Sequence, residues 1–451
     1  MVYGYRGKAL EILRQFDVKP GDRIRVEKEG KIYEGILMPR SELGDDRHLV
    51  LKLPNGYNIG ISIEGIRLTK VEEGKLSRPE PPPLRQDATK PKVAIVGTGG
   101  TIASRVDYRT GAVFPAFTPE EICASVPELL EMANIEVVEA CNVFSEHMTP
   151  ELWVRIAREV ANQINKGVTG VVVTHGTDTM SYTAAALSFM LQNLFRPVVL
   201  TGAQRSSDRP SSDAALNLVA ATATALSDIA EVCVVMHGSM SDDYMLIHRG
   251  VRVRKCHTSR RDAFLSINDL PLGRVRGTKI EMFRQDYKRV KPSGRVEVDD
   301  QIDPNVALVK VYPGMRPELI EGLIGKCHGI VLEGTGLGHA PQNLFPVLKR
   351  AAEEGIILVM TSQCLWGRVN MRVYSTGRDL LELGVVPAED MLPEVAYVKL
   401  MWILGKTKEP SKVKELMLTN FAGEISERSR SDLFPPQPSS GYTDFPLPLR
   451  A

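Results

Sequence analysis

The chain has 451 residues, enough for about three folding units, and a net charge of only +1. With 43% hydrophobic and 25% charged residues it has the composition of a globular protein, which excludes a disordered chain. So small a net charge argues against a chain that captures nucleic acid by its own electrostatic field. The opening residues lack the apolar core of a signal peptide, and no apolar run is long enough to span a bilayer, so we expect a cytoplasmic protein.

Residues 20–72 contain short alternating apolar runs that are separated by turn signals such as Pro20-Gly21. These runs are 23–26, 32–37, 48–53 and 57–63. Their spacing predicts a small all-β, SH3-like barrel over residues 1–75. The segment 76–91 is rich in proline, which favours an extended conformation, and we expect a linker there.

After the linker, continuous β-branched runs alternate with helical stretches, a pattern typical of parallel sheets buried on both faces. The sequence therefore predicts an N-terminal α/β domain over 92–290 and a C-terminal α/β domain over 304–428, followed by an irregular tail at 429–451. In the first domain we expect strands at 93–97, 171–174, 198–201 and 232–237 and helices at 151–166 and 213–226. In the second we expect strands at 306–312, 329–333 and 356–360 and helices near 317–326 and 343–354.

The six cysteines are scattered and include no CxxC pair. They are Cys123, Cys141, Cys233, Cys256, Cys327 and Cys364. Free cysteine packs as a small hydrophobe, so we expect reduced thiols, mostly in the core, and no structural metal.

Ligands of an open parallel sheet bind beyond the carboxyl ends of its strands, so the segments that leave the strands are candidates for a site. The first predicted strand runs into Gly97-Thr98-Gly99-Gly100-Thr101, where glycines let the backbone approach a ligand closely. This segment is not a dinucleotide loop, because Ile102 stands where the third glycine belongs, and it lacks the GK[ST] of a phosphate loop. A tight strand-to-helix turn remains the plain alternative.

The second predicted strand ends in Thr174-His175-Gly176-Thr177-Asp178-Thr179. Thr177 and Asp178 offer a hydroxyl and a carboxylate at one strand end. The alternative is a helix N-cap, for which Thr179 or Ser181 is suited.

Lys255 ends the basic segment 249–255, which is either a solvated face or the source of a desolvated lysine. Burial lowers the pKa of a lysine, so such an amine can act as a neutral general base. A hydroxyl that attacks an amide needs such a base and an oxyanion site, and backbone N–H groups of the glycine loop could supply the latter.

At these residues the chain resembles the type I/II L-asparaginase family. The resemblance rests on GTGGTIAS (97–104), THGTDTM (174–180), TGAQR (201–205) and the Lys255 segment, in this order, and extends from about residue 92 to about 410. It implies a two-domain asparaginase-like body and hydrolysis of a side-chain amide through a threonyl acyl-enzyme. It also implies Thr101 as nucleophile and a triad of Thr177, Lys255 and Asp178.

The same resemblance assigns substrate contacts. It implies that Tyr108 belongs to a mobile lid, that Gly100 binds substrate, that Ser145 holds the α-carboxylate, and that Asp178 also binds the α-amino group. Many asparaginases have Gln after this serine, whereas this chain has Glu146, which could strengthen binding of the α-ammonium or alter the choice between Asn and Gln. No metal is implied.

The added front, with its barrel and linker, and the segment TGAQRSSDRPSSDA (201–214) resemble the D-subunit family of archaeal glutamyl-tRNA(Gln) amidotransferases. That resemblance implies a glutaminase that frees ammonia from Gln or Asn for a tRNA-binding partner subunit. The partner would use ATP and Mg to convert Glu-tRNA(Gln) to Gln-tRNA(Gln). It also implies a homodimer as the core of a heterotetramer, and no cofactor in this chain. The alternatives are a free-standing L-asparaginase with a fused barrel and a binding scaffold that has lost catalysis.

Overall fold

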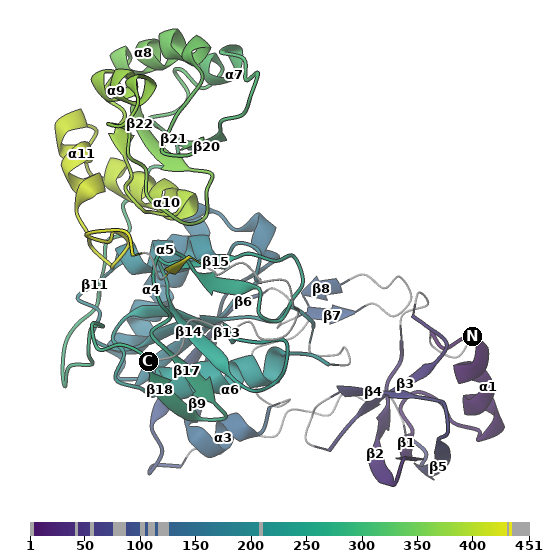
Figure 1. The fold of residues 1–451 in the computed structure, drawn as a ribbon. Helices are drawn as coiled ribbons and strands as arrows, with labels where there is room; N and C mark the ends of the chain where they lie inside the picture. The colour runs from purple at the N-terminus through teal and green to yellow at the C-terminus, as the bar shows by residue number, and fades with distance from the viewer. Residues whose placement is uncertain are drawn as a thin grey trace.

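The computed structural model describes residues 4–40, 44–54, 58–74, 87–99, 104–106, 113–115, 126–206, 211–430 and 433–434. An N-terminal unit lies beside the first of two α/β units, and the second α/β unit lies above the first in the view of Figure 1. No helix in these ranges combines the length and the apolar character needed to cross a membrane.

A five-stranded antiparallel sheet makes up most of the N-terminal unit. Its strand order is β4-β3-β2-β1-β5, with β1 (Arg23–Lys28), β2 (Lys31–Leu37), β3 (His48–Lys52), β4 (Asn58–Ser62) and β5 (Arg67–Glu72). Along β1, Ile24 and Val26 are fully buried whereas Arg23 and Arg25 are exposed. This alternation of buried and exposed side chains is that of a strand with one face on a core.

Two features of this unit differ from the expected all-β barrel. The helix α1 (Gly7–Gln15) precedes the sheet and places Ala9 and Leu13 in its core. The strands β4 and β5 lie at opposite ends of the sheet, and no ladder joins them within residues 4–40, 44–54 and 58–74, so the sheet is open there. The unit therefore has a helix that the strand–turn pattern did not predict.

The first α/β unit is built on an eight-stranded sheet of order β18-β17-β14-β13-β12-β10-β6-β9. Its strands are β6 (Lys92–Gly99), β9 (Asn134–Val143), β10 (Gly170–Thr174), β12 (Val198–Thr201), β13 (Val232–His237), β14 (Met245–Arg249), β17 (Gly273–Arg276) and β18 (Lys279–Met282). The five strands from β9 to β13 in this order are parallel, and β14, β17 and β18 extend the sheet in antiparallel fashion. The four predicted strands are confirmed, and the other four were not predicted.

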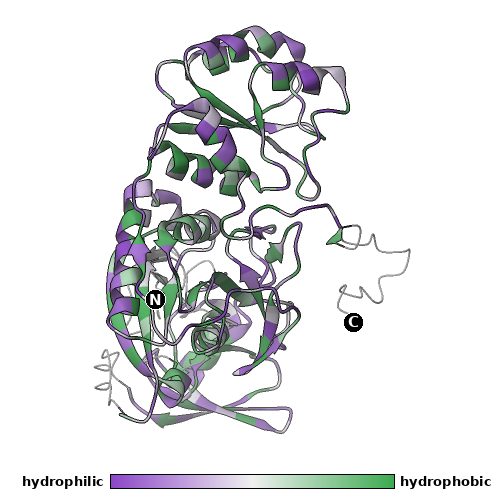
Figure 2. Cartoon of the chain, turned by 90° about the vertical axis from the view of Figure 1, so that its left-hand side faces the viewer, coloured by the Kyte–Doolittle hydropathy of each residue, from purple (hydrophilic) through white to green (hydrophobic). Residues whose placement is uncertain are grey.

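Helices cover both faces of this sheet, because the strands are apolar on both sides. Val93 and Ile95 of β6 face one core, which includes α6 (Ala214–Ala225) and α3 (Glu128–Met132). Ala94 and Val96 face the other, which includes α4 (Pro150–Asn165) and α5 (Met180–Met190). Thr149 caps the N-terminus of α4, since its side chain accepts a hydrogen bond from Leu152 N. Figure 2 shows the hydrophobic residues gathered in the central strands.

The second α/β unit has a four-stranded parallel sheet of order β20-β21-β22-β23. Its elements are β20 (Val306–Lys310), β21 (Gly329–Gly334), β22 (Ile357–Ser362), β23 (Val386–Pro387), α7 (Glu318–Glu321), α8 (Phe345–Glu353), α9 (Ser375–Glu382), α10 (Pro393–Leu404) and α11 (Pro410–Leu418). The helix expected near 317–326 is shorter, because Gly322 follows its last residue and Gly325 adopts a positive φ of 75°. Of the expected irregular tail, residues 431–432 and 435–451 lie outside the described residues.

The helix α10 joins the two α/β units. It is buried along nearly its whole length and packs against α5 of the first unit and against β20 and β21 of the second. Trp402 of α10 stacks on Phe189 of α5 with ring centroids 5.6 Å apart. The two units therefore share one hydrophobic core.

Short elements complete the described chain. They are the strand pairs β7 (Ser104–Val106) with β8 (Val113–Pro115), β11 (Leu191–Gln192) with β19 (Glu297–Val298), and β15 (Val253–Lys255) with β16 (Phe264–Ser266), and the 3-10 helices η2 (Ser145–His147) and η3 (Gln342–Leu344).

The described cysteines are free thiols, but they are not mostly in the core as expected. Cys141 and Cys233 are buried, whereas Cys256 and Cys364 are exposed and Cys327 lies between. Burial raises the pKa of the Cys141 thiol to about 11. Cys123 lies outside the described residues.

Candidate active site

The carboxyl ends of β6, β10 and β12 meet at one edge of the large sheet. The Thr98 hydroxyl donates to Thr174 O at 2.9 Å and so joins the ends of β6 and β10. The Thr201 hydroxyl donates to Val235 O at 2.9 Å and joins β12 to β13. Hydrogen bonds of polar side chains thus hold neighbouring strand ends together, and the predicted site residues follow these strand ends in the chain.

At this edge the structure brings Lys255 together with Thr177 and Asp178. Lys255 Nζ donates to Thr177 Oγ1 at 2.8 Å and to Asp178 Oδ1 at 2.8 Å. Thr177 is almost fully buried, and the Lys255 side chain is 12% exposed, whereas that of Asp178 is 67% exposed. The hydroxyl and the amine thus lie inside the protein while the carboxylate reaches the solvent side.

Lys255 reaches this place because it lies on a hairpin and not on the main sheet. The strands β15 and β16 pair in antiparallel fashion, with Lys255 opposite Phe264. Val253 and Phe264 are buried in the core that α4 and α5 share. The burial of these two side chains fixes the hairpin against the core. The basic segment 249–255 is therefore not a solvated face, which was the alternative interpretation.

Ser145 lies next to the loop that carries Thr177. It begins η2 and is 4% exposed. A Cβ on Gly176 would come within 2.7 Å of Ser145 Cβ, so only glycine allows this approach. Thr179 occupies the N-cap position of α5, but its Oγ1 donates to Ser145 O at 2.7 Å and makes no cap bond to the helix, so its side chain supports the site and not the helix end.

The other predicted site residues are placed only in part. Glu146 follows Ser145 in η2, and its side chain is exposed. Gly100, Thr101 and Tyr108 lie outside the described residues.

A buried polar chain supports the Thr177 loop and was not predicted. His175 Nδ1 lies 2.7 Å from Gly176 O, and its Nε2 lies 2.8 Å from Thr183 Oγ1. Trp153 Nε1 donates to the same hydroxyl at 3.1 Å. His175 is part of the THGTDTM motif, so the sequence pointed to this residue. Its partners Trp153 and Thr183 lie on α4 and α5, and they come close to it only in the folded protein.

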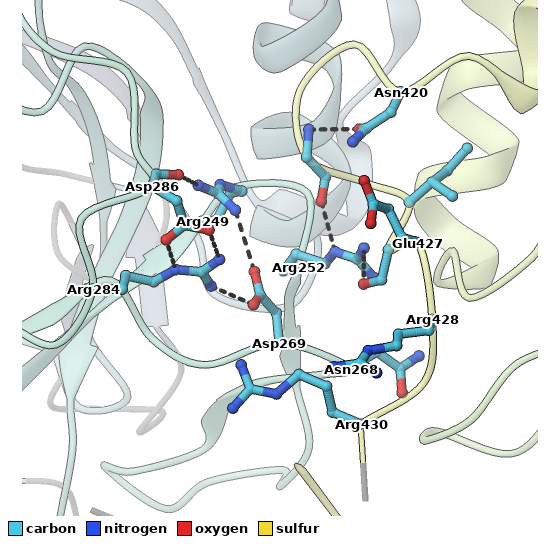
Figure 3. A pocket seen from close by; sticks show the side chains of 13 residues that line it. Arg249, Arg252, Asn268, Asp269, Arg284, Asp286, Asn420, Glu427, Arg428 and Arg430 are labelled. Carbon is cyan, nitrogen blue, oxygen red and sulfur yellow. Dashed lines mark hydrogen bonds and ion pairs between the residues drawn. The ribbon is translucent and has the colours of Figure 1, made fainter. Parts of the chain in front are cut away.

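A second cluster of charges lies apart, where residues 420–430 meet the turn after β14 (Figure 3). A cavity of about 520 Å³ is lined there by five arginines, which are Arg249, Arg252, Arg284, Arg428 and Arg430. Arg249 lies 2.7 Å from Glu231 and 3.3 Å from Asp269, and Arg252 lies 3.0 Å from Asp390. Because carboxylates neutralise the buried arginines, this cavity is an ion-paired junction between the two units.

The Thr177–Lys255–Asp178 arrangement has the parts of an activated hydroxyl. An amine within hydrogen-bond reach of a hydroxyl can take its proton when neutral, and a carboxylate beside the amine orients it. Within the described ranges no group of three His, Cys, Asp or Glu side chains is placed to hold a metal ion. The geometry fits base-assisted chemistry on a hydroxyl.

Family models match three stretches that together make up most of the chain. Residues 92–288 match "Asparaginase, N-terminal", residues 305–417 match "Glutaminase/Asparaginase C-terminal domain", and residues 18–71 match "GatD N-terminal domain". The expected asparaginase-like two-domain α/β body is thereby confirmed.

Individual relatives agree with these matches. The D subunit of the glutamyl-tRNA(Gln) amidotransferase of Pyrococcus furiosus is 56% identical over 94% of this chain and 99% of its own length. The D subunit of the Methanothermobacter thermautotrophicus enzyme is 51% identical over 94% of this chain and 98% of its own.

Solved structures of asparaginases resemble part of the chain. The thermostable L-asparaginase from Thermococcus kodakarensis superposes with a TM-score of 0.67 at 36% identity, covering 75% of this chain and 100% of that one. L-asparaginase I from Vibrio cholerae gives a TM-score of 0.64 at 34% identity, covering 75% of this chain and 99% of that one. Taken with the near full-length relatives, these likenesses show that the chain belongs to the family of glutamyl-tRNA(Gln) amidotransferase D subunits, which join an asparaginase body to an N-terminal domain of their own.

Proposed function

We propose that this chain is the glutaminase subunit of a tRNA-dependent amidotransferase and frees ammonia from the side-chain amide of Gln or Asn. One observation carries the proposal: Lys255 Nζ lies 2.8 Å from both Thr177 Oγ1 and Asp178 Oδ1 at the strand ends. The L-asparaginases named above, which share the body's fold, act by their names on an amide side chain.

In the proposed reaction a threonine hydroxyl attacks the amide carbon, and Thr101 is the residue we assign to this step. The hydroxyl proton passes to a base, for which Lys255 acting with Thr177 is the candidate, and a proton returns to the nitrogen as the C–N bond breaks. Ammonia leaves an ester on the threonine, and water hydrolyses that ester to the free acid. Gly100 is our candidate for the oxyanion site, and Tyr108 for the lid.

The remaining substrate contacts extend the assignment. Ser145, held against Gly176, would bind the α-carboxylate of the amino acid. The exposed carboxylates of Asp178 and Glu146 would bind its α-ammonium. The site as proposed needs no metal and no cofactor in this chain.

The relatives' name supports a role for a partner. They are D subunits of an enzyme that amidates glutamyl-tRNA(Gln), so we propose a partner subunit that binds the tRNA and uses ATP and Mg. We also propose a homodimer of this chain as the core of a heterotetramer, in the cytoplasm where aminoacyl-tRNA is used.

A free-standing L-asparaginase is the second candidate. The likeness of the body to such enzymes favours it, but the match of residues 18–71 to a GatD domain opposes it. An inactive scaffold would have no need to keep a lysine 12% exposed beside a buried threonine hydroxyl.

The first test measures ammonia release from Gln and from Asn, with and without the partner subunit and Glu-tRNA(Gln). Strong stimulation by both supports the amidotransferase, whereas indifference supports the free-standing enzyme. Thr101→Ala, Thr177→Val, Asp178→Asn and Lys255→Ala should each lower amide hydrolysis by about a hundredfold or more. Amidation by the complex with added ammonium should survive in each variant. Unchanged glutaminase turnover in Lys255→Ala would contradict the proposed triad.

A further inference from the structure

A chain of hydrogen-bonded polar side chains lies behind the candidate active site. We call it the strand-end network, and it consists of Asp213, Asn217, His237, Asp242 and Arg261. Asp213, Asn217 and His237 are completely buried, Asp213 and Asn217 at the start of α6 and His237 at the end of β13. Buried polar groups are costly unless they are paired, so a network of this kind has a structural or a chemical role.

One end of the network reaches Thr177. Asn217 Nδ2 donates to Gly202 O at 3.0 Å and to Asp213 Oδ2 at 3.1 Å. Gly202 lies directly behind Thr177, because a Cβ on Gly202 would come within 3.1 Å of Thr177 Cγ2 and 2.4 Å of His175 O. A shift of Asn217 would therefore move the backbone on which Thr177 rests.

The other end reaches the hairpin of Lys255. Arg261 lies in the turn between β15 and β16, and its Nη1 is 2.6 Å from Asp242 Oδ1. Its Nη2 donates to Ser211 O at 2.5 Å. The turn is closed by the Cys256 N to Ala263 O bond at 2.7 Å, next to Lys255, so Arg261 fixes the position of the lysine.

His237 joins the two ends and must carry two protons to do so. Its Nδ1 lies 2.7 Å from Asn217 Oδ1 and its Nε2 lies 3.2 Å from Asp242 Oδ1. The orientation of Asn217 follows from its two donated bonds to oxygen, so its Oδ1 is an acceptor and Nδ1 of His237 is the donor. The Asp242 carboxylate also only accepts, so both contacts are hydrogen bonds only when His237 is an imidazolium.

The surroundings of His237 shift its pKa in opposite directions. Burial lowers the pKa of His237, the carboxylates of Asp213 and Asp242 raise it, and Arg261 lowers it. The net direction is downward, so the imidazolium forms on the acid side and is lost as the pH rises. Neutral His237 would point a lone pair at the Asp242 carboxylate, which is 58% exposed, and the contact between them would no longer be a hydrogen bond.

We propose that His237 is a positioning residue whose imidazolium form ties the backbone under Thr177 to the hairpin of Lys255. The inference rests on the function proposed above, because it concerns the alignment of that site. Loss of the second proton breaks one bond of the network and loosens the alignment of the hydroxyl and the amine.

Asp242→Asn is the decisive variant, since its exposed side chain makes misfolding no concern. Oδ1 of Asp242 makes both contacts, so the new asparagine turns about χ2 to donate its amide N–H to neutral His237 and to accept from Arg261 with its oxygen. The link then no longer needs the extra proton. From about pH 5.5 to 8.5 we expect the ratio of wild-type to variant kcat to fall by about fivefold to tenfold, with KM unchanged. A ratio that stays constant over this range would overturn the proposal.

Arg261→Ala tests the end of the network at the Lys255 hairpin, and Arg260→Ala in the same turn is its control. Among the described residues the Arg260 side chain forms an ion pair with Asp262, at 2.7 Å, and it is 49% exposed. Arg261→Ala should lower kcat roughly ten- to a hundredfold with little change in KM, and Arg260→Ala should not. Equal losses in the two variants would contradict a role for the network.

A spectroscopic measurement separates this inference from the proposed function. The ¹⁵N resonances of histidine, assigned with His237→Gln, report the protonation of both ring nitrogens without any turnover. Two protonated nitrogens at acid pH, with the second lost in wild type as pH rises, support the bridge even if the chain hydrolyses no amide. A His237 that carries a single proton from about pH 5 upward would refute it, even in an active enzyme.

Discussion

His175 shows how a single buried side chain is paired without a charge. Its Nδ1–H can donate to Gly176 O while its Nε2 accepts from the Thr183 hydroxyl, which accepts in turn from Trp153 Nε1. One tautomer of the neutral ring therefore satisfies every partner. The ring is fully buried, and this burial lowers the pKa of His175 to about 4.

The pH dependence of stability follows from that pKa. The unfolded histidine titrates near 6.5, so the unfolded chain binds the extra proton first, and stability is complete above about pH 6.5 and falls towards about pH 4. Between pH 7 and 5 His175 should remove about 2 kcal/mol of unfolding free energy, which His175→Gln should spare. Urea unfolding at the two pH values measures this, with exposed His147→Gln as control. Equal losses in wild type and His175→Gln would contradict it.

At the scale of elements, α10 holds the last described part of the chain through a buried ion pair. Lys399 and Glu424 are both fully buried, with Nζ and Oε1 2.7 Å apart. Lys399 also donates to Met417 O and Thr419 O, and Glu424 accepts from the N–H groups of Phe421 and Ala422. Burial lowers the pKa of Lys399, and the Glu424 carboxylate opposes that shift. The pair therefore fastens the segment after α11 to α10.

Removal of one partner of this pair should be costly. Lys399→Met leaves a buried carboxylate without its cation and should lower the free energy of unfolding by about 3–5 kcal/mol. The double variant Lys399→Met with Glu424→Leu should recover part of the loss, because no lone charge remains. Lys412→Met, which removes an exposed pair with Glu415 on α11, is the matched control. Urea unfolding would speak against the argument if the double variant were no more stable than Lys399→Met.

For the whole molecule, the arrangement of the cores sets how it unfolds. The N-terminal unit has a core of its own, formed by residues between Tyr5 and Leu68. The two α/β units share a core through α10 and the ion pair of Arg252 with Asp390 at 3.0 Å. One described backbone bond from Ser211 N to Asn58 O, at 3.4 Å, links the N-terminal unit to the body. The body should unfold as one cooperative unit and the N-terminal unit as another.

Calorimetry of the full chain tests this division. Ile24→Ala empties space in the N-terminal core and should lower the smaller transition, by about 2–5 kcal/mol at its midpoint, without moving the larger one. Arg252→Met removes the nearest cation of the buried Asp390 carboxylate and should lower only the larger transition. A single transition that both variants shift equally would show that the units are coupled.

The sequence predicted the elements that repeat a simple pattern. The parallel strands β6, β10, β12 and β13 are continuous apolar runs and were all identified. The strands β9, β14, β17 and β18 were not, because edge and antiparallel strands carry mixed polar and apolar residues and have no single period. The helix α1, which precedes the strand–turn pattern, was not predicted either.

By itself the sequence determined the class of the body, the glycine and threonine motifs at the strand ends, and Thr177, Asp178 and Lys255 as candidates, because these are local patterns of residue type. Only the tertiary structure decided that Lys255 and Thr177, 78 positions apart, lie 2.8 Å from each other. It alone also brought His237, Asn217 and Arg261 into one network behind that pair. The reason is physical: a hydrogen bond depends on a distance of about 3 Å, and the packing of distant strands and hairpins sets that distance.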